Sequence, residues 1–466
     1  MTEPVGGSFR DMHHFDASDE EFGDRALDFS RRRMRLDAEA GGVALGHPVP
    51  REDLDAVLGP SITESGLGSV EVLRIFTEVL EPVCLATDFP RYLAYVPAAP
   101  TEVSIIADMV VSACSIYGGT WLEGAGAVWA ENQALAWVAG LAGLPAEAGG
   151  CFVAGGTVGN LSALVAARHT EASRRPPPPH GDWALIAGES SHASMRTAAD
   201  VMGVELILVP GRKLTGAALQ PVLAANRDRV FAVVATAGST NLGLVDDLRS
   251  VSDVCRAHEV WLHVDGAFGG AAMAAPSARP RFDGVEHADS LIVDPHKWLF
   301  APFDACALLY RQPELARRAH AQHAGYLDLD TDIAGPEDWN PSDYAIHLSR
   351  RARGLPFWFS LAAYGARAYG DAVQACLDLT AAGAGMIRES EHLELVAEPE
   401  LSVLAFRRRG WEPREYGAWS RRMFDTGTAL VVPSSLDGQT IMRLCLVNPR
   451  TTVEDLQLVL GSMTTG

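Results

Sequence analysis

The chain has 466 residues and a formal net charge of −21, from 38 basic and 59 acidic side chains. This acidic balance argues against nucleic acid or an anionic membrane surface as a partner. With 48% hydrophobic and 21% charged residues, the composition is typical of a globular protein with a large core and two or three domains. Only two residues are lysines, Lys213 and Lys297. Because arginine stays protonated, lysine-based covalent chemistry must use one of these two amines.

Targeting and redox signals are weak. The N-terminus lacks the positive start and apolar run of a signal peptide, and the most apolar long stretch, residues 103–122, contains Asp108, Gly118 and Gly119. This stretch predicts buried helix and loop, not a membrane span. The seven cysteines are scattered without a CxxC pair, which indicates free thiols and predicts no metal site. We therefore expect a cytoplasmic protein without a membrane or nucleic-acid partner.

Three regions follow one another along the chain. Residues 1–85 predict a helical N-terminal segment. Residues 86–360 alternate helical segments with short apolar runs at 183–187, 205–209, 231–235, 261–264, 291–293 and 305–310. Such runs are typical of a mostly parallel sheet buried on both faces, in an α/β domain. Residues 361–466 predict a small α+β domain with an alanine-rich helix, strands at 401–407, 429–432 and 442–447, and a helix from Val453.

Lys297 lies between a histidine and a tryptophan, where the predicted strand 291–293 runs into a polar turn. A solvated lysine has a pKa of about 10.4 and is inert. A partly buried lysine with a lowered pKa can form a Schiff base with an aldehyde such as pyridoxal 5′-phosphate (PLP). A lone lysine is more often a surface residue, so the neighbouring motifs decide. Lys213 lies in a turn with no such motif, and we expect a solvated loop residue there.

Asp265 ends another apolar strand and is followed by small residues, among them Ala267. A carboxylate at the carboxyl end of a parallel strand lies in the crevice where open α/β sheets bind ligands. It could pair with a protonated pyridine nitrogen, although a helix N-cap or a metal ligand would use the same group. Ala267 is small enough to pack beneath a ring.

Two further patterns fit a cofactor site. Gly155 and Gly156 follow an apolar strand, and Thr157 opens a helix, an arrangement in which backbone N–H groups and the helix dipole bind phosphate. His192 and the segment 235–240 each follow a predicted strand. A histidine there could stack on a cofactor ring or move a proton, but an ordinary turn histidine is the common alternative.

Taken in this order, the segments resemble the group II PLP-dependent amino-acid decarboxylases, the family of aromatic-L-amino-acid decarboxylase. The resemblance covers about residues 85–365 and depends on the combination of Gly155-Gly156-Thr157, His192, Asp265-x-Ala267 and His296-Lys297-Trp298. It implies the fold of the fold type I PLP enzymes (aspartate aminotransferase-like), with a mostly parallel central sheet flanked by helices. It also implies a homodimer with active sites at the subunit interface.

The same resemblance implies roles for individual residues. Lys297 would carry the Schiff base and Asp265 would bind the pyridine nitrogen, while His192 and Ala267 would contact the two faces of the ring. The phosphate would be held by Gly155, Gly156 and Thr157, helped by Asp294 or its neighbours, including His296, and by Thr236 or Ser239. The aromatic residues expected on the substrate side are Phe89, Tyr95, Tyr117 and Trp121.

Some residues depart from the family pattern. Phe89 replaces the usual histidine before Pro90, Gly119 replaces an aromatic residue before Trp121, and residues 123–126 lack the Ser-Pro-Ala motif. No tyrosine occurs at 327–342, where the animal enzymes have a loop tyrosine that donates a proton. The principal hypothesis is PLP-dependent decarboxylation of an L-amino acid to an amine. The alternatives are a decarboxylation-dependent oxidative deaminase that forms an aldehyde, another PLP lyase or transaminase, and a non-catalytic cofactor-binding protein.

Overall fold

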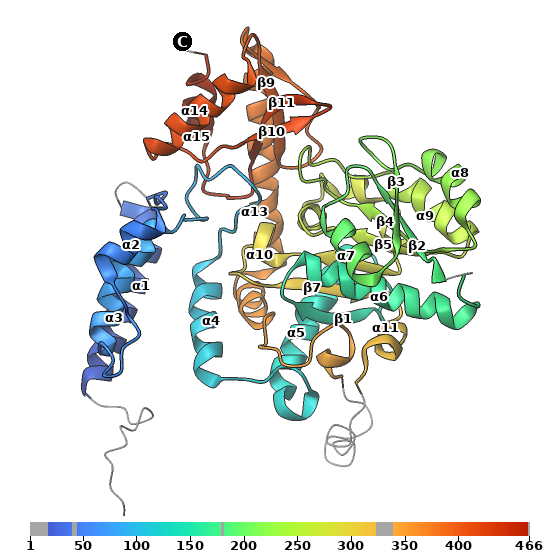
Figure 1. Cartoon of the computed structure of the whole chain (residues 1–466), viewed down its shortest axis with the longest axis horizontal. Coiled ribbons are helices and arrows are strands. Elements are labelled where there is room, and N and C mark those ends of the chain that lie inside the picture. The colour runs from blue at the N-terminus through green and yellow to red at the C-terminus, as the bar shows by residue number, and fades with distance from the viewer. Residues whose placement is uncertain (1–16, 40–43, 179–180, 323–338, 465–466) are drawn as a thin grey trace, which may run out of the picture.

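The computed structural model of the chain describes residues 17–39, 44–178, 181–322 and 339–464. The ribbon consists of a layer of N-terminal helices, a large α/β part and a smaller C-terminal α+β part (Figure 1). The N-terminal layer contains α1 (Ala17–Glu39), α2 (Arg51–Leu58), α3 (Ser69–Ile75), a π-helical turn (Phe76–Leu80) and a 3-10 turn (Glu81–Val83). Arg33 of α1 makes two hydrogen bonds, of 3.0 and 2.7 Å, to the carboxylate of Asp88, which joins this layer to the rest of the molecule.

A seven-stranded sheet forms the centre of the large part, in the order β1-β7-β6-β5-β4-β2-β3. The strands are β1 (Gly149–Val153), β2 (Ala184–Gly188), β3 (Glu205–Val209), β4 (Val230–Thr236), β5 (Trp261–Asp265), β6 (Ser290–Val293) and β7 (Cys306–Tyr310). Strands β2 to β6 pair in parallel, and β7 is antiparallel to both β1 and β6. The predicted mostly parallel sheet is confirmed, and each of the six predicted apolar runs overlaps one of its strands.

Helices cover both faces of this sheet, because successive side chains of a strand point to opposite sides. In β2, Ala184 and Ile186 belong to one buried core, and Leu185 and Ala187 belong to the other. The first core is covered by α5 (Trp121–Leu141), α8 (Gly216–Asn226), α9 (Leu248–Ala257) and the first half of α13 (Leu355–Glu389). The second is covered by α6 (Gly156–Arg174), α7 (Ser194–Met202) and α11 (Pro313–His320).

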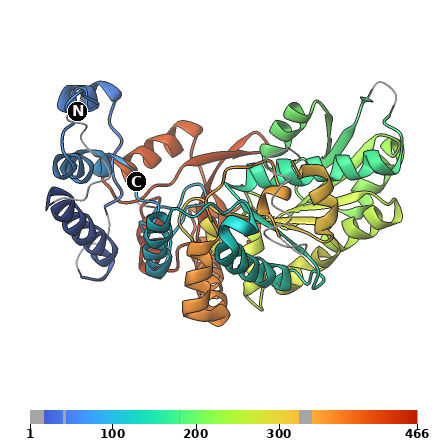
Figure 2. The ribbon, with the colours of Figure 1, turned by 90° about the horizontal axis from the view of Figure 1, so that it is seen from below.

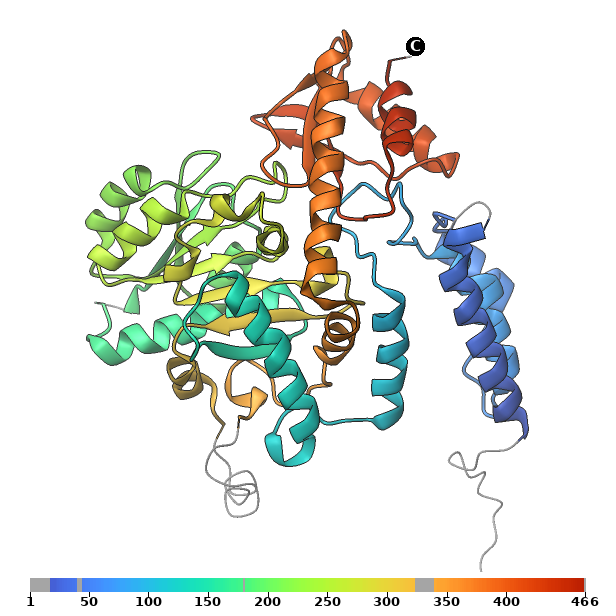
Figure 3. The same ribbon diagram turned by 180° about the vertical axis from the view of Figure 1, so that it is seen from behind.

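Helix α4 (Glu102–Cys114) lies outside these two layers and packs against α13 (Figures 2 and 3). The expectation that residues 103–122 are buried is wrong for one face of α4. Ile106, Met109 and Val110 on that face are 45%, 47% and 47% exposed. In the part of the chain that the structure describes, no helix combines the length and apolar character needed to cross a membrane.

The C-terminal part contains a four-stranded antiparallel sheet in the order β10-β11-β9-β8. Its elements are β8 (Leu393–Leu395), β9 (Val403–Arg408), α14 (Pro413–Asp425), β10 (Pro433–Leu436), β11 (Gln439–Cys445) and α15 (Val453–Gly461). The strand predicted at 429–432 is wrong: Leu430 makes only an isolated bridge with Tyr92, and the strand begins at Pro433. Leu430 pairs with Tyr92 and not with a neighbouring strand, and no local sequence pattern indicates this long-range contact. Residue 360, the predicted domain boundary, lies inside α13.

Candidate active site

One cavity, of about 580 Å³, lies at the edge of the central sheet where the parallel strands end. Ten of its lining residues are the cofactor-binding residues expected from the sequence: Gly155, Gly156, Thr157, His192, Thr236, Asp265, Ala267, Asp294, His296 and Lys297. Residues distant in sequence meet here because β4, β5 and β6 are parallel neighbours. Thr236 at the end of β4 is the register partner of Asp265 at the end of β5.

Lys297 lies in α10 (Pro295–Trp298), a single helical turn directly after β6. Its Nζ is 2.8 Å from Oδ2 of Asp294, which is 1% exposed. Burial lowers the pKa of Lys297, but the carboxylates of Asp294 and Asp265 raise it more, so that its net direction is upward. Two carboxylates therefore stabilise the ammonium form of Lys297 more than burial opposes it.

Asp265 is 7% exposed and points its two oxygens toward donors from different elements. Its Oδ1 accepts a hydrogen bond from the backbone N–H of Ala267 at 3.1 Å, and its Oδ2 accepts one from Nδ2 of Asn160 at 2.9 Å. At the neighbouring strand end, the backbone N–H of Thr236 donates to Oδ2 of Asp246 at 2.7 Å. Burial raises the pKa of Asp246 to about 6. These contacts hold both strand ends in place.

The cavity has the features that PLP requires. Two buried oxygens on its lining residues, Oγ1 of Thr236 and Oδ1 of Asp294, have no hydrogen-bond partner. The first turn of α6 begins at Gly156 and offers N–H groups that no helical carbonyl accepts. A Cβ at Gly156 would lie 3.2 Å from Cβ of Ala267 and 3.2 Å from Oδ2 of Asp294, so that a larger residue would fill the space beside them. An amine, a pair of carboxylates, unpartnered polar oxygens and a helix N-terminus together fit an aldehyde, a pyridine ring and a phosphate.

The aromatic residues expected on the substrate side lie in different places. Tyr95 lines the cavity. Phe89 is 4% exposed and packs in a separate apolar cluster with Tyr92 and Leu430. Tyr117 donates to the backbone oxygen of Leu348, and neither Tyr117 nor Trp121 lines the cavity of its own chain.

Two other predictions have different outcomes. Ser239, expected as an alternative phosphate ligand, is not among the lining residues, and its hydroxyl accepts from the backbone N–H of Leu244. The stretch 327–342, noted for its lack of tyrosine, is described only from Trp339, and residues 327–338 lie outside the described residues.

Several lining residues were not predicted, above all Asn160, Phe303 and Arg443. Asn160 lies one helical turn after Gly156, and a polar residue among the small and apolar residues that open α6 was the signal available for it. Arg443 lies on β11, in the C-terminal sheet. It is 6% exposed, its Nη2 donates to the backbone oxygen of Tyr95 at 3.0 Å, and its Nε has no partner. No sequence signal connects it with the large domain.

Comparison with known proteins gives the class of the chain. The family model described as the pyridoxal-dependent decarboxylase conserved domain matches residues 56–409. The chain therefore belongs to the pyridoxal-dependent decarboxylase family and is a PLP-dependent carboxy-lyase, as its resemblance to group II decarboxylases predicted.

Individual relatives act on different amino acids. The chain is 29% identical to the aromatic-L-amino-acid decarboxylase of Bacillus atrophaeus over 419 residues, covering 86% of this chain and 85% of the relative. It is also 29% identical to the L-2,4-diaminobutyrate decarboxylase of Rhizobium meliloti, covering 88% and 84%. The 4-hydroxyphenylacetaldehyde synthase of Rhodiola rosea is 25% identical, covering 72% and 71%. The fold is shared with the crystal structure of Oryza sativa TDC with PLP and tryptamine, which has a TM-score of 0.88, 23% identity and coverage of 98% and 99%.

Proposed function

We propose that the enzyme decarboxylates an L-amino acid to the corresponding amine and carbon dioxide, with PLP attached to Lys297. The observation that carries this proposal is the placement of one amine, Lys297, beside Asp294 and in the same cavity as Asp265 and His192. When bound, PLP would supply an aldehyde that can react with an amine and a protonated pyridine ring that can accept the electron pair left by departing carbon dioxide.

Different residues of the cavity bind different parts of the cofactor. Asp265 pairs with the pyridine nitrogen and keeps it protonated, while His192 and Ala267 contact the ring. Gly155, Gly156 and Thr157 bind the phosphate through the start of α6, assisted by Thr236 and His296, while Asp294 holds the amine of Lys297. Among the lining groups, Nζ of Lys297 and the imidazole of His192 are our candidates for holding the proton needed at the α-carbon.

Arg443 is our candidate for binding the α-carboxylate of the substrate. Its guanidinium is buried at the cavity wall, its Nε is without a hydrogen-bond partner, and no carboxylate in the described ranges forms an ion pair with it. A buried arginine with an open donor favours a carboxylate ligand. Around it the wall contains Tyr95, Val96, Phe268 and Phe303. An apolar wall of this kind favours an aromatic or branched aliphatic side chain on the substrate.

The low lysine count makes the attachment site simple to test. Borohydride reduction fixes a lysine-bound cofactor permanently, and peptide mass spectrometry then locates the added mass. We expect it on the peptide with Lys297, and none on the peptide with Lys213; label on Lys213 alone would contradict the assignment. Carbon dioxide and amine released from a panel of L-amino acids then define the substrate, and the absence of both from a broad panel would contradict decarboxylation.

An aldehyde-forming oxidative deaminase is the second candidate, favoured by the absence of tyrosine at 327–342 and by the aldehyde synthase among the relatives. This reaction consumes oxygen and water and releases carbon dioxide, an aldehyde, ammonia and hydrogen peroxide, and slow return of a proton to the α-carbon would favour it. Hydrogen peroxide formed in equal amount to carbon dioxide would support this candidate. Full activity without oxygen, with amine as the product, would exclude it.

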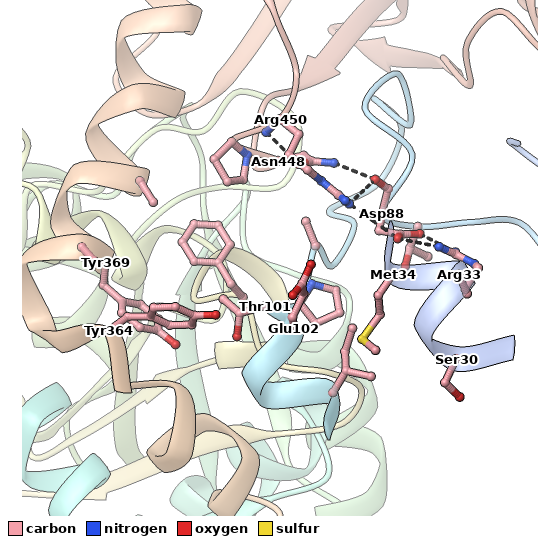
Figure 4. A pocket seen from close by; sticks show the side chains of 18 of the residues that line it. Ser30, Arg33, Met34, Asp88, Thr101, Glu102, Tyr364, Tyr369, Asn448 and Arg450 are labelled. Carbon is pink, nitrogen blue, oxygen red and sulfur yellow. Dashed lines mark hydrogen bonds and ion pairs between the residues drawn. The ribbon is translucent and has the colours of Figure 1, made fainter. Parts of the chain in front are cut away.

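We further propose that the working unit is a homodimer. Large apolar side chains are exposed on three neighbouring helices: Ile106, Met109 and Val110 on α4, Trp129 on α5, and Phe359 and Tyr364 on α13. A second cavity continues this surface. It has a volume of about 750 Å³ and lies between α1 and the helices α4 and α13, with Phe29, Met34, Ile105 and Tyr364 among its lining residues (Figure 4).

At one end of this cavity, Asp88 forms hydrogen bonds with residues from two of the cavity walls. Its carboxylate accepts from Arg33, and its backbone oxygen accepts from Asn448 at 2.9 Å and from Arg450 at 2.7 Å (Figure 4). Polar contacts at one end and apolar side chains such as Phe29, Ile105 and Tyr364 along the walls suit a second copy of the chain. We propose that Tyr117 and Trp121, which precede and begin α5, act at the partner's cavity in this dimer, since neither lines the cavity of its own chain.

Light scattering tests the dimer. Val110→Asp places a charge on the exposed face of α4 and should give a monomer with little activity. Val201→Asp, a change of the same kind at a valine of α7 that is 66% exposed, is the matched control and should stay dimeric. A monomeric wild type with full activity would contradict the proposal.

A further inference from the structure

Asn160 connects three polar side chains in the interior between α6 and the sheet. Its Nδ2 donates to Oδ2 of Asp265 at 2.9 Å and to Oγ of Ser194 at 3.0 Å, and its Oδ1 is 2.8 Å from Nε2 of His263. Asn160 is 1% exposed and His263 is 0% exposed. A buried amide costs free energy unless its hydrogen-bonding groups are satisfied, and here both donors and the acceptor have partners.

The chain of hydrogen bonds continues away from the cavity. Nδ1 of His263 is 2.8 Å from Oγ of Ser290, and Oγ of Ser290 accepts from Nε1 of Trp261 at 2.8 Å. A carboxylate can only accept, so the NH₂ group of Asn160 faces Asp265 and its Oδ1 accepts from Nε2 of His263. Trp261 donates to Oγ of Ser290, and in a neutral His263 with its proton on Nε2, Nδ1 accepts from Ser290.

Burial lowers the pKa of His263 to about 4. The imidazole is therefore neutral at physiological pH. It holds Asn160 through a hydrogen bond from an uncharged group. In consequence, the negative charge of Asp265 is not cancelled by a buried cation behind it.

The second NH of Asn160 leads to the histidine of the cavity. Since Oγ of Ser194 accepts from Asn160, its own proton is available for Nδ1 of His192, 2.9 Å away. The backbone N–H of Ser194 also donates to Nδ1 of His192, at 3.2 Å. Nδ1 of His192 is thus an acceptor, and its ring proton is on Nε2.

Close packing of α6 against β6 makes these contacts possible. A Cβ at Gly159 would lie 2.9 Å from Cγ2 of Ile292, so only glycine allows the helix to approach the sheet this closely. Asn160, the next residue, can then reach Asp265 on β5 with a short side chain.

We propose that Asn160 is a positioning residue for the cofactor: one amide fixes the carboxylate of Asp265 and, through Ser194, the tautomer of His192. The inference depends on the proposed function, since Asp265 and His192 are the residues assigned there to the ring nitrogen and the ring face. Asn160 itself acts through these two residues and is not assigned a contact with the reacting atoms.

Asn160→Leu tests the proposal, because it keeps the approximate volume and removes all three hydrogen bonds. We expect PLP to bind apoenzyme at least tenfold more weakly, with a shifted visible absorbance maximum, and kcat to fall about a hundredfold with little change in KM. In an Asp265→Asn background, Asn160→Leu should cause little further change in the spectrum, because the two changes act through one interaction. Thr170→Val is the matched control on α6, since Thr170 is 5% exposed and its Oγ1 has no partner.

Circular dichroism checks that the variant folds. Asn160→Asp retains the side-chain shape but, when ionised, cannot donate to Asp265, and it serves if the leucine variant misfolds. It should show the same losses. Unchanged PLP affinity and spectrum in a folded variant would overturn the proposal, even if the melting temperature falls. The proposed function fails separately: if wild-type enzyme releases no carbon dioxide from any amino acid, the PLP affinity and spectrum still decide the role of Asn160.

Discussion

Nζ of Lys297 and Oδ2 of Asp294 lie 2.8 Å apart, three residues from each other in the chain, at the point where β6 turns into α10. The ion pair stabilises the protonated amine, whereas attack on an aldehyde requires the neutral amine. The contact that holds Lys297 in position therefore opposes the step that attaches the cofactor.

A first prediction follows for Asp294→Asn. Removing the charge of Asp294 removes the main contribution that raises the pKa of Lys297, so that more of the amine is neutral at a given pH. We expect apoenzyme with this change to take up PLP several-fold faster at pH 7.5. The rate of uptake should also depend less steeply on pH than that of wild type. Stopped-flow absorbance measures the rate, and a slower uptake than that of wild type would refute the explanation.

The second prediction compares the two lysines. Lys297→Ala should abolish turnover and the visible absorbance of bound PLP. Lys213→Ala should retain both, because Lys213 pairs with Glu400 at 2.9 Å and does not line the cavity. Loss of this partly exposed pair should cost at most about 1 kcal/mol of unfolding free energy. Turnover by Lys297→Ala at the wild-type rate would show that another group does the chemistry.

The third prediction concerns Arg443→Met, which keeps the length of the side chain and removes its charge. If Arg443 binds the α-carboxylate, KM should rise tenfold or more, corresponding to a loss of about 1.4 kcal/mol or more in binding. PLP affinity should change little. Initial rates and a PLP titration separate the two effects; a selective loss of PLP affinity would place Arg443 at the cofactor instead.

The fourth prediction is a pH dependence of stability. The pKa of His263 is about 4 in the folded protein and near 6.5 when unfolded. The unfolded state therefore binds more protons between these values. The stability gained from burying neutral His263 is complete above pH 6.5 and is lost as the pH falls toward 4, by about 1.4 kcal/mol per pH unit. Urea unfolding at several pH values should show a shallower slope for His263→Gln, and equal slopes would contradict the lowered pKa.

The sequence predicted those parts of the molecule that depend on local pattern. Buried parallel strands are continuous apolar runs, so their positions were found to within about two residues. Lys297, Asp265 and Gly156 each follow a strand, and parallel strands end at one edge, so their convergence could be expected.

Long-range contacts could not be predicted. Arg443 follows Asp265 by 178 residues in the chain and lies on a different sheet. It reaches the cavity only because the C-terminal domain packs over the large domain. The pairing of Leu430 with Tyr92 shifted a strand by four residues from its predicted start. The raised pKa of Lys297 depends on the direction of the Asp294 side chain, which sequence spacing does not determine.

Helix α13 belongs to two cores at once. Phe357, Tyr369 and Val373 pack in the core of the large sheet, and Leu379 and Ile387, further along the same helix, pack in the core of the C-terminal sheet. Neither domain can lose its packing without exposing apolar surface of a helix that the other requires. The two domains should therefore melt in one calorimetric transition, and damage far from the cavity should lower the melting temperature of the whole enzyme.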